Sequence, residues 1–366
     1  MESSIKNSPV VFAVGTDYKI FVPVKDCTLM WVKVGDKCYF DHSNGVLRSA
    51  VTVHKMSIPM EELDREGRYT VCYRRVIERK PYFSETSEVY EESFDFYPMP
   101  CDNYNIYHIS DAHGMVNQPA AGAKHFEEKY GRIDLLILNG DIFEHSGSIE
   151  NFDAVYEIAS LITGGKIPVV FSRGNHDTRG IYAEVIADYT PTRGGYSYFS
   201  FRIGSLWGLV VDCGEDKPDT NAEYGNTICC HEFRMEQTRY IESIIENAEN
   251  EYAAQGVKRK IVIAHSPFTK TFTPPFNIEE DTYAYWTKLL REHIKPELMI
   301  CGHTHVLNVS LPGDEQDAYG QGCPVIVAAT PNQKEKTFIG GGFVFSGDET
   351  KLVFANQDGI ISEQKI

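Results

Sequence analysis

The spacing of apolar and polar positions changes along this chain near residue 98. Before that point, seven short apolar runs rich in β-branched and aromatic residues alternate with turn signals such as Ser-Asn-Gly, which predicts β-strands. After it, apolar runs of strand length alternate with longer helical patterns, as in ENFDAVYEIASLI and TYAYWTKLLREHI. We therefore expect two domains, a β-rich one over residues 1–98 and a layered α/β one over residues 99–366.

The β-rich first part has the strand density of a small sandwich of the immunoglobulin or fibronectin type III kind. Its stretch LDREGRYTVCYRRV resembles the tyrosine-corner region of such modules, with Tyr69 as the corner residue. The longest irregular segment, residues 213–230, lies in the second part and is a candidate wall of a functional site.

Polar motifs follow five apolar runs of the second part, IYHIS, LLILN, PVVFS, KIVIA and ELMIC. The motifs contain side chains that can bind metals: Asp111, His113, Asp141, Asn175, His265, His303 and His305. The carboxyl ends of strands in an α/β sheet open onto one crevice, so we expect these side chains to converge. A lone histidine such as His265 is more often a satisfied core residue, but five such clusters would be costly to bury without a neutralising cation.

The residue types indicate which metals fit. Imidazole nitrogens, carboxylates and an amide oxygen suit Zn, Mn or Fe, whereas an all-oxygen set would suggest Mg or Ca. The set contains no cysteine, which argues against a structural zinc site. We expect two cations bridged by the Asp141 carboxylate at about 3.5–4 Å, a spacing that generates a hydroxide nucleophile and neutralises charge in an in-line phosphoryl displacement.

Composition limits the possible binding partners and the cellular compartment. The 366 residues include 35 Lys and Arg against 52 Asp and Glu, a formal net charge of −17 that opposes nonspecific binding to nucleic acid or anionic membranes. No apolar run approaches the ~20 residues of a membrane span, and the N-terminal run is too short for a secretory signal. Nine cysteines without a Cys-x-x-Cys pair favour reduced thiols, so we expect a cytoplasmic protein. The oligomeric state is left open.

In this order, the motifs DxH, GD, GNHD, H and GHxH resemble the signature of the calcineurin-like metallophosphoesterase superfamily, over roughly residues 103–330. The resemblance implies a four-layer αββα sandwich with a dinuclear site. It also implies that one metal is held by Asp111, His113, Asp141 and His305, and the other by Asp141, Asn175, His265 and His303.

The resemblance further implies roles at the substrate. His176 is expected to contact the phosphate or to protonate the leaving oxygen. Glu144, three residues after the bridging aspartate, is expected to orient His176, although a solvated loop acid is an equally good interpretation. Asp177 is expected to orient a ligand imidazole. The candidates for phosphate binding are Asn175, His176, Arg173, Arg179 and His145, of which Arg173 has an alternative structural interpretation and His145 an alternative surface one.

Two departures separate the chain from branches of that superfamily. Purple acid phosphatases, whose N-terminal β-sandwich layout is similar, need Asp-x-Gly in the first motif and a tyrosine ligand three residues after the bridging aspartate. His113 and Glu144 occupy those positions here, so we expect an uncoloured site with Zn or Mn. Ser/Thr protein phosphatases carry an arginine where this chain has His145, which argues against protein phosphatase activity.

The expected function is therefore metal-dependent hydrolysis of phosphomonoesters or phosphodiesters, with His176 assisting the leaving group. The alternative is a noncatalytic metal-binding scaffold on the same fold that recruits a partner; the complete ligand set favours the enzyme. Aromatic residues in the segment HSPFTKTFTPPFN after His265 suit a planar, nucleotide-like leaving group, although core packing explains many aromatics equally well. The choice between monoester and diester stays open, as does the metal.

Overall fold

Two β-sheets face each other at the centre of the molecule. The computed structural model describes residues 3–366. The larger sheet has ten strands, in the order β23 (Gly359–Lys365), β22 (Glu349–Asn356), β21 (Thr337–Ser346), β11 (Tyr104–Ile109), β12 (Leu135–Asn139), β13 (Pro168–Ser172), β1 (Val10–Val14), β2 (Asp17–Pro23) and β7 (Val53–Pro59), with β20 (Thr330–Asn332) paired to β21. The smaller sheet has the order β14 (Phe199–Ile203), β15 (Leu206–Val211), β16 (Arg259–Ala264), β17 (Leu298–Cys301), β19 (Val325–Val327) and β18 (Asn308–Ser310).

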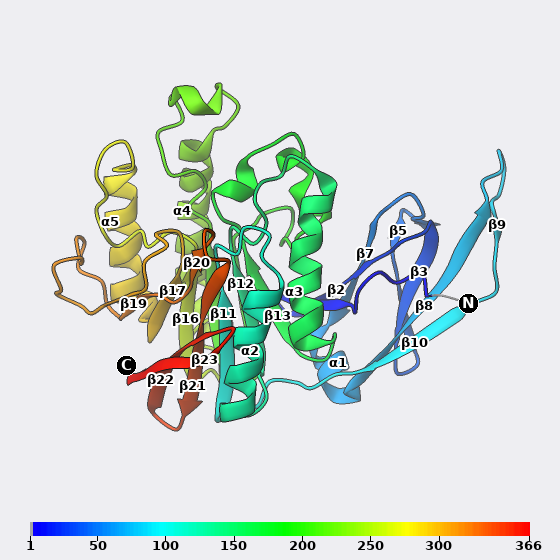
Figure 1. The fold of residues 1–366 in the computed structure, drawn as a ribbon, viewed down its shortest axis with the longest axis horizontal. Helices are drawn as coiled ribbons and strands as arrows, with labels where there is room; N and C mark the ends of the chain where they lie inside the picture. The colour runs from blue at the N-terminus through cyan, green and yellow to red at the C-terminus, as the bar shows by residue number, and fades with distance from the viewer. Residues whose placement is uncertain (1–2) are drawn as a thin grey trace.

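Helices cover the outer face of each sheet (Figure 1). The larger sheet is covered by α2 (Asn117–Tyr130) and α3 (Asp153–Thr163), and the smaller one by α4 (Cys230–Glu246) and α5 (Glu280–Leu289), which continues as a π-helix over Leu290–Ile294. Short 3-10 helices span Ile149–Phe152, His176–Thr178, Ala183–Asp188, Ala222–Tyr224 and Ala248–Asn250. Within residues 3–366, none of these helices has the length and apolar character needed to cross a membrane.

The packing of β12 shows why four layers form. Successive side chains of a strand point to opposite faces, so a fully apolar strand supplies two cores. Ile137 packs between the two sheets with residues such as Ile261, whereas Leu136 and Leu138 pack outward in the cluster that contains Phe126 of α2. A third apolar cluster lies between the smaller sheet and its helices. The predicted αββα sandwich is confirmed.

A β-rich region precedes the α/β layers in the chain, as the sequence predicts. Its five-stranded sheet contains β10 (Tyr90–Asp95), β8 (Arg68–Glu78), β3 (Thr28–Val34) and β4 (Lys37–Phe40), with β9 (Glu85–Thr86) paired to β8; the remaining elements are α1 (Met60–Glu66), β5 (His42–Ser43) and β6 (Val46–Leu47). Apolar residues of this sheet, such as Met30 and Val71, share a core with Ile20 and Ile58 of the larger sheet. The sandwich thus uses an extension of the larger sheet as its second layer.

The boundary near residue 98 separates two sequence patterns and does not separate two sheets. Strand β1 pairs in parallel with β13, with Val11 opposite Pro168, so the first strand of the chain lies inside the larger sheet. All five residues of β1 are buried. A continuous apolar run without alternation is typical of a parallel strand covered on both faces, and the same run also fits a sandwich strand. The two cannot be distinguished from periodicity alone.

The prediction of a tyrosine corner at Tyr69 is wrong. The buried Tyr69 hydroxyl donates a hydrogen bond of 2.8 Å to the backbone carbonyl of Gly165, which follows α3 in the α/β layers. A corner residue would bond to backbone a few positions upstream. Tyr69 instead joins the N-terminal sheet to the rest of the molecule.

Candidate metal centre

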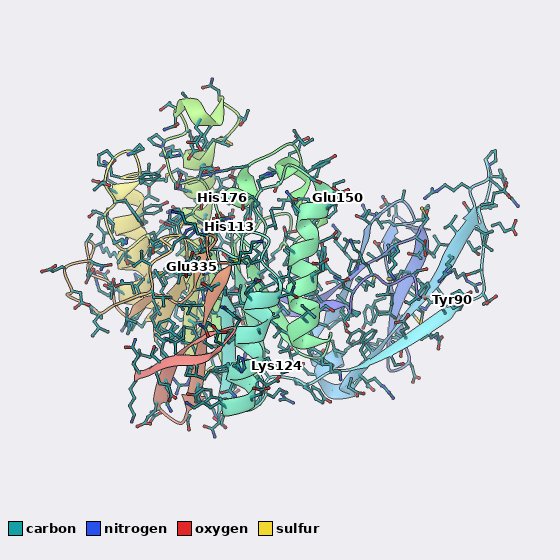
Figure 2. All side chains as sticks on the ribbon, in the orientation of Figure 1. Tyr90, His113, Lys124, Glu150, His176 and Glu335 are labelled. Atoms are coloured by element: carbon teal, nitrogen blue, oxygen red, sulfur yellow. The ribbon has the colours of Figure 1, made fainter. Side chains whose placement is uncertain are left out.

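The carboxyl ends of two groups of parallel strands bring the five polar motifs together. Strands β11, β12 and β13 are parallel neighbours in the larger sheet, and β16 and β17 are parallel neighbours in the smaller one. Three overlapping groups result, in each of which the ligand atoms all lie within 4.8 Å of one another: Asp111, His113 and His305; His113, Asp141 and His176; and Asp111, Asp141 and His265. Figure 2 shows His113 and His176 near each other, far from Tyr90 on the N-terminal sheet.

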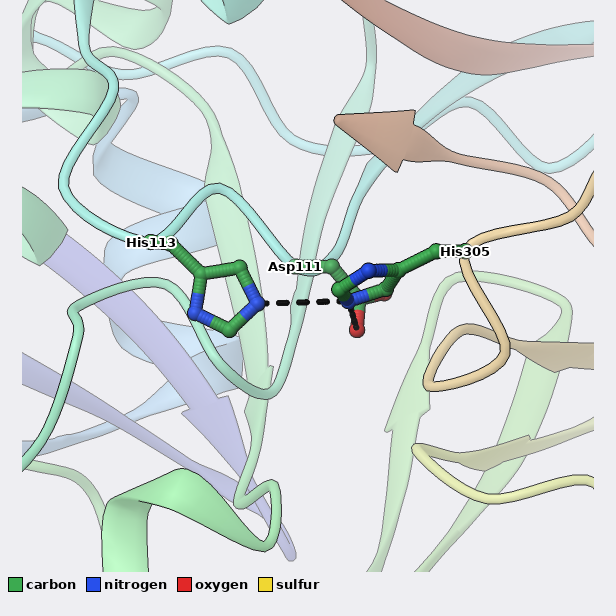
Figure 3. A group of neighbouring side chains, drawn as sticks. All are labelled: Asp111, His113 and His305. Carbon is green, nitrogen blue, oxygen red and sulfur yellow. Dashed lines mark hydrogen bonds and ion pairs between the residues drawn. The ribbon is translucent and has the colours of Figure 1, made fainter. Parts of the chain in front are cut away.

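The first group contains two imidazoles that approach each other directly, with one carboxylate next to His305 (Figure 3). His305 Nε2 lies 3.2 Å from Asp111 Oδ1, and it also lies 3.2 Å from His113 Nε2. Two imidazole nitrogens and a carboxylate oxygen that converge in this way form a donor set suited to a transition-type cation.

The third group contains His265. Its Nδ1 donates to the backbone carbonyl of Asn139 at 2.7 Å, which directs Nε2 toward the carboxylates, 3.3 Å from Asp141 Oδ2. That Nε2 atom is buried and makes no hydrogen bond within residues 3–366. A backbone acceptor on one ring nitrogen commonly prepares the other nitrogen to bind a metal. Close by, His303 Nδ1 lies 3.0 Å from Asn175 Oδ1.

The backbone of the site adopts an unfavourable conformation at five of the predicted ligands. The φ angles are positive at Asp111 (57°), His113 (45°), Asp141 (53°), His303 (69°) and His305 (53°). The left-handed region costs about 1–2 kcal/mol for each non-glycine residue. Such residues cluster at functional sites, where side-chain placement outweighs the strain.

Two motif glycines are required because they leave space for the ligands. A Cβ atom on Gly174 would overlap with Asp141 Oδ1, and one on Gly302 would overlap with Ser110 Oγ and a carboxylate oxygen of Asp111. The glycines of GNHD and GHTH therefore let the strand-end loops of the two sheets approach the carboxylates closely.

The electrostatics of the site favour ionised carboxylates. Burial raises the pKa of Asp141, but the neighbouring His265 outweighs it and holds this pKa below its usual range; the pKa of Asp111 is lowered in the same way. Burial lowers the pKa of His265, but the attraction of Asp141 and Asp111 raises it to about 10. Burial and His265 lower the pKa of His303 to about 4. The carboxylates thus carry the charge that a cation would neutralise.

His176 lies beside the first group, with its ring centre 4.8 Å from that of His113. Its Nδ1 donates to the backbone carbonyl of Glu144 at 3.0 Å, and its backbone N–H donates to Asp141 Oδ1 at 2.9 Å. The acceptor is thus the carbonyl of Glu144, whereas the carboxylate proposed for this role is 53% exposed and lies 3.6 Å from His113 Nδ1. Position 144 orients His176 through its backbone.

The two candidate arginines differ in their surroundings. Arg179 donates two hydrogen bonds of 2.9 Å, from Nε and Nη2, to the carboxylate of Glu215. Its Nη1 lies 3.2 Å from His176 Nε2. Arg173 donates from Nε to Asp212 at 2.6 Å and lies over the ring of Phe233. Arg179 therefore faces the candidate catalytic histidine, while the contacts of Arg173 match its structural interpretation.

Asp177 and His145 have other contacts than the predicted ones. Asp177 is fully buried, accepts a bond of 2.8 Å from the backbone N–H of Gly174, and leaves its other oxygen unbonded within residues 3–366. Burial, followed by the charge of Asp141, raises the pKa of Asp177 to about 8. His145 is exposed and its Nδ1 accepts from the backbone N–H of Gly147 at 3.0 Å. Asp177 thus supports the GNHD loop, and His145 matches its surface interpretation.

Two residues that support the site were not singled out from the sequence. One is Glu215, which pairs with Arg179, and the other is Asn139. The buried Asn139 amide lies 3.2 Å from His108 Nε2 and 3.2 Å from the backbone carbonyls of Ala264 and Ile300. It therefore connects strands of both sheets directly beneath the metal ligands. The available signal was an amide that ends the apolar run LLILN, because a polar residue at the end of a buried strand needs partners.

Converging carboxylates and imidazoles of this kind can hold metal ions that activate water for hydrolysis. The family model described as calcineurin-like phosphoesterase matches residues 104–307, more than half of the chain. The protein belongs to the calcineurin-like phosphoesterase family, and this membership implies divalent metal ions at the site.

A solved structure shows the same fold. A purple acid phosphatase from seeds of yellow lupin (Lupinus luteus) aligns over 99% of this chain and 75% of its own, with a TM-score of 0.60 and 13% sequence identity. A dimetal phosphatase from Danio rerio aligns over 74% of this chain and 99% of its own, with a TM-score of 0.47 and 12% identity. The first alignment includes the β-rich N-terminal region. No curated protein sequence gives a significant match.

Proposed function

We propose that this protein is a dinuclear metal-dependent phosphoesterase that hydrolyses phosphomonoesters or phosphodiesters. The observation that carries the proposal is the convergence of ligand-type side chains on one site: Asp111, His113, Asp141, His265 and His305 offer atoms in overlapping groups, and His303 and Asn175 adjoin them. Asp111, His113, Asp141 and His305 would hold one cation, and Asp141, Asn175, His265 and His303 the other. Bound Zn, Mn or Fe ions would supply a hydroxide nucleophile and neutralise the transferred phosphoryl group.

His176 is the residue that we assign to the leaving group. Its Nδ1 proton is held by the Glu144 carbonyl, so Nε2, which accepts a hydrogen bond from Arg179 Nη1, is the ring nitrogen that would exchange a proton with a substrate oxygen. Arg179 faces the same Nε2 atom and carries a guanidinium fork that matches phosphate oxygens. We therefore assign phosphate binding to Arg179 and Asn175 ahead of Arg173 and His145.

The proposal extends to the kind of substrate and to the compartment. A cavity with aromatic walls next to His303 supports an ester with a planar organic group, such as a nucleotide. Nine free cysteines support a reducing compartment, and we place the enzyme in the cytoplasm. A net charge of −17 opposes nonspecific binding to nucleic acid or anionic membrane.

The test is metal analysis of the purified protein combined with hydrolysis assays in Mn and in Zn. We expect two metal ions per chain and turnover of p-nitrophenyl phosphate, bis-p-nitrophenyl phosphate or both. Comparing the two esters also distinguishes a monoesterase from a diesterase. Two bound metals without turnover of either ester would refute the enzyme and support the scaffold alternative.

A further inference from the structure

A cavity of about 550 Å³ opens directly beside the candidate metal centre. His303 and Asp216 line this cavity, and they also line a smaller one that reaches Asn175 and His265. The Phe272 ring stands on its wall, with its centre 6.1 Å from that of the His303 imidazole. An ester whose phosphate lies at the metal ligands therefore has a continuous path for its organic group.

Three large apolar side chains stand among the polar residues that line this cavity. Phe276 is 36% exposed and Val306 is 64% exposed, and both line the cavity together with Phe272. Large exposed apolar side chains that gather at one place mark binding sites. The volume is in the range that accommodates a drug-sized ligand, on the order of 300–1,000 Å³.

A lysine adds a hydrogen-bond donor to the aromatic wall. The half-buried Lys270 ammonium lies 4.9 Å from the centre of the Phe272 ring. Within the described chain, no carboxylate lies within 4.0 Å of this ammonium, so its protons are available to a ligand. Aromatic faces with a nearby cation suit a planar ring that carries a hydrogen-bond acceptor.

Two other cavities that border the site have a different character. The one beside Arg179 is lined by Glu184, Glu215 and Glu223, which would repel a group attached to a phosphate. The one beside His305 has a mainly polar lining that includes Thr330 and Lys334. Among these three, the cavity at Phe272 has two phenylalanine rings in its lining, whereas the cavity beside Arg179 has one aromatic residue, Tyr224, next to its three glutamates.

We infer that the aromatic groove, defined by Lys270, Phe272, Phe276 and Val306, receives the planar aromatic group of the substrate. Phe272 and Phe276 select aromatic phosphate esters over small aliphatic ones by stacking. This inference rests on the proposed phosphoesterase function, because the phosphate must lie at the metal ligands for its substituent to reach the groove.

The test measures binding, because leaving-group acidity alters turnover independently of the groove. Metal-loaded protein is titrated with 2-naphthylmethylphosphonate, methylphosphonate and orthophosphate. We expect the naphthyl compound to bind at least about tenfold more tightly than methylphosphonate, since stacking on an aromatic side chain is worth about 1–3 kcal/mol. Phe272→Ala and Phe276→Ala should each remove most of this preference and leave the affinity for orthophosphate within about twofold.

The matched control is Phe83→Ala, since Phe83 is 79% exposed on the β8–β9 hairpin, and it should bind all three ligands like the parent. Both groove positions are at least partly exposed, so the variants should fold, which thermal unfolding checks. If both variants still bind orthophosphate and keep the parent's preference for the naphthyl compound, the groove does not bind the aromatic group. The phosphoesterase proposal would then still stand. Loss of orthophosphate binding by the metal-loaded parent would overturn both.

Discussion

The backbone carbonyl of Asn139 accepts the Nδ1 proton of His265 at 2.7 Å. Strand β12 of the larger sheet thereby sets the orientation of a candidate metal ligand that follows β16 of the smaller sheet. The same residue uses its side-chain amide to reach the carbonyls of Ala264 and Ile300 and the ring of His108. The alignment of the two halves of the metal centre depends on this asparagine.

Asn139→Ala should weaken both the fold and the metal site. Its loss leaves buried acceptors without their donor, so we expect the free energy of unfolding to fall by about 1–3 kcal/mol. Supporting contacts of metal ligands typically account for about 10–100-fold in affinity, and we expect a loss of that order at the His265 side. Urea denaturation and metal titration measure the two effects. The control is Asn250→Ala at an exposed asparagine; equal metal affinity in both variants would contradict the role.

Removal of a single ligand should abolish most activity. Asn175→Ala and His303→Ala each remove one of two neighbouring candidate ligands, whose Oδ1 and Nδ1 atoms lie 3.0 Å apart. We expect kcat to fall by orders of magnitude and bound metal to fall below two ions per chain, as mass spectrometry or atomic absorption would show. His293→Ala, at an exposed histidine of the π-helix, serves as the control. Unchanged rates in Asn175→Ala and His303→Ala would refute the site.

The left-handed backbone at His113 predicts an unusual order of stabilities. Both His113→Gly and His113→Ala remove the imidazole, but only glycine relieves the positive φ of 45°. In metal-free protein we expect the glycine variant to be more stable than the alanine variant by about 1 kcal/mol. The same pair at His265, where φ is not positive, should give the opposite order. Thermal unfolding with chelator present makes the comparison, and the same order at both positions would argue against strain.

Arg179 and His176 should affect catalysis in different ways. His176→Ala is expected to lower kcat by about 10²–10⁴-fold, the range of general acid catalysis. Arg179→Lys keeps the charge but loses the two-point pairing with Glu215, so we expect a higher KM with a smaller change in kcat. Steady-state kinetics with p-nitrophenyl phosphate separates the two parameters. If Arg179→Lys matched the parent in KM, Arg179 would not contact the phosphate.

Asp64 provides a stability effect that depends on pH. Burial raises its pKa above the value of an unfolded chain, about 3.9, and the hydrogen bond from the Tyr18 hydroxyl offsets this only in part. A raised carboxyl pKa favours the folded state at low pH, and this contribution is lost as pH rises through the folded-state pKa. Asp64→Asn should therefore gain stability relative to the parent between pH 4 and pH 7. Urea denaturation across this range tests the sign, with the exposed Glu61→Gln on the same helix as control.

Features that depend on a few neighbouring residues could be predicted from the sequence. Apolar runs of five residues, each followed by a ligand-type motif, located β11 and β12 and the seven candidate ligands, because strand period and side-chain chemistry are local properties. The convergence of those ligands followed from a general property of parallel strands, whose carboxyl ends meet at one edge. The chemistry of the side chains then indicated the kind of metal.

The tertiary structure alone decided what depends on distant segments. The pairing of β1 with β13 and the bond from Tyr69 to Gly165 join residues about a hundred or more positions apart, and no local pattern encodes such a choice. Likewise, the orienting carbonyl of Glu144 and the strained φ angles arise from loop geometry that the carboxylates and imidazoles impose on the backbone. The sequence by itself determined which atoms can bind metal and phosphate; the packing of two sheets decided where those atoms meet and which aromatic side chains lie beside them.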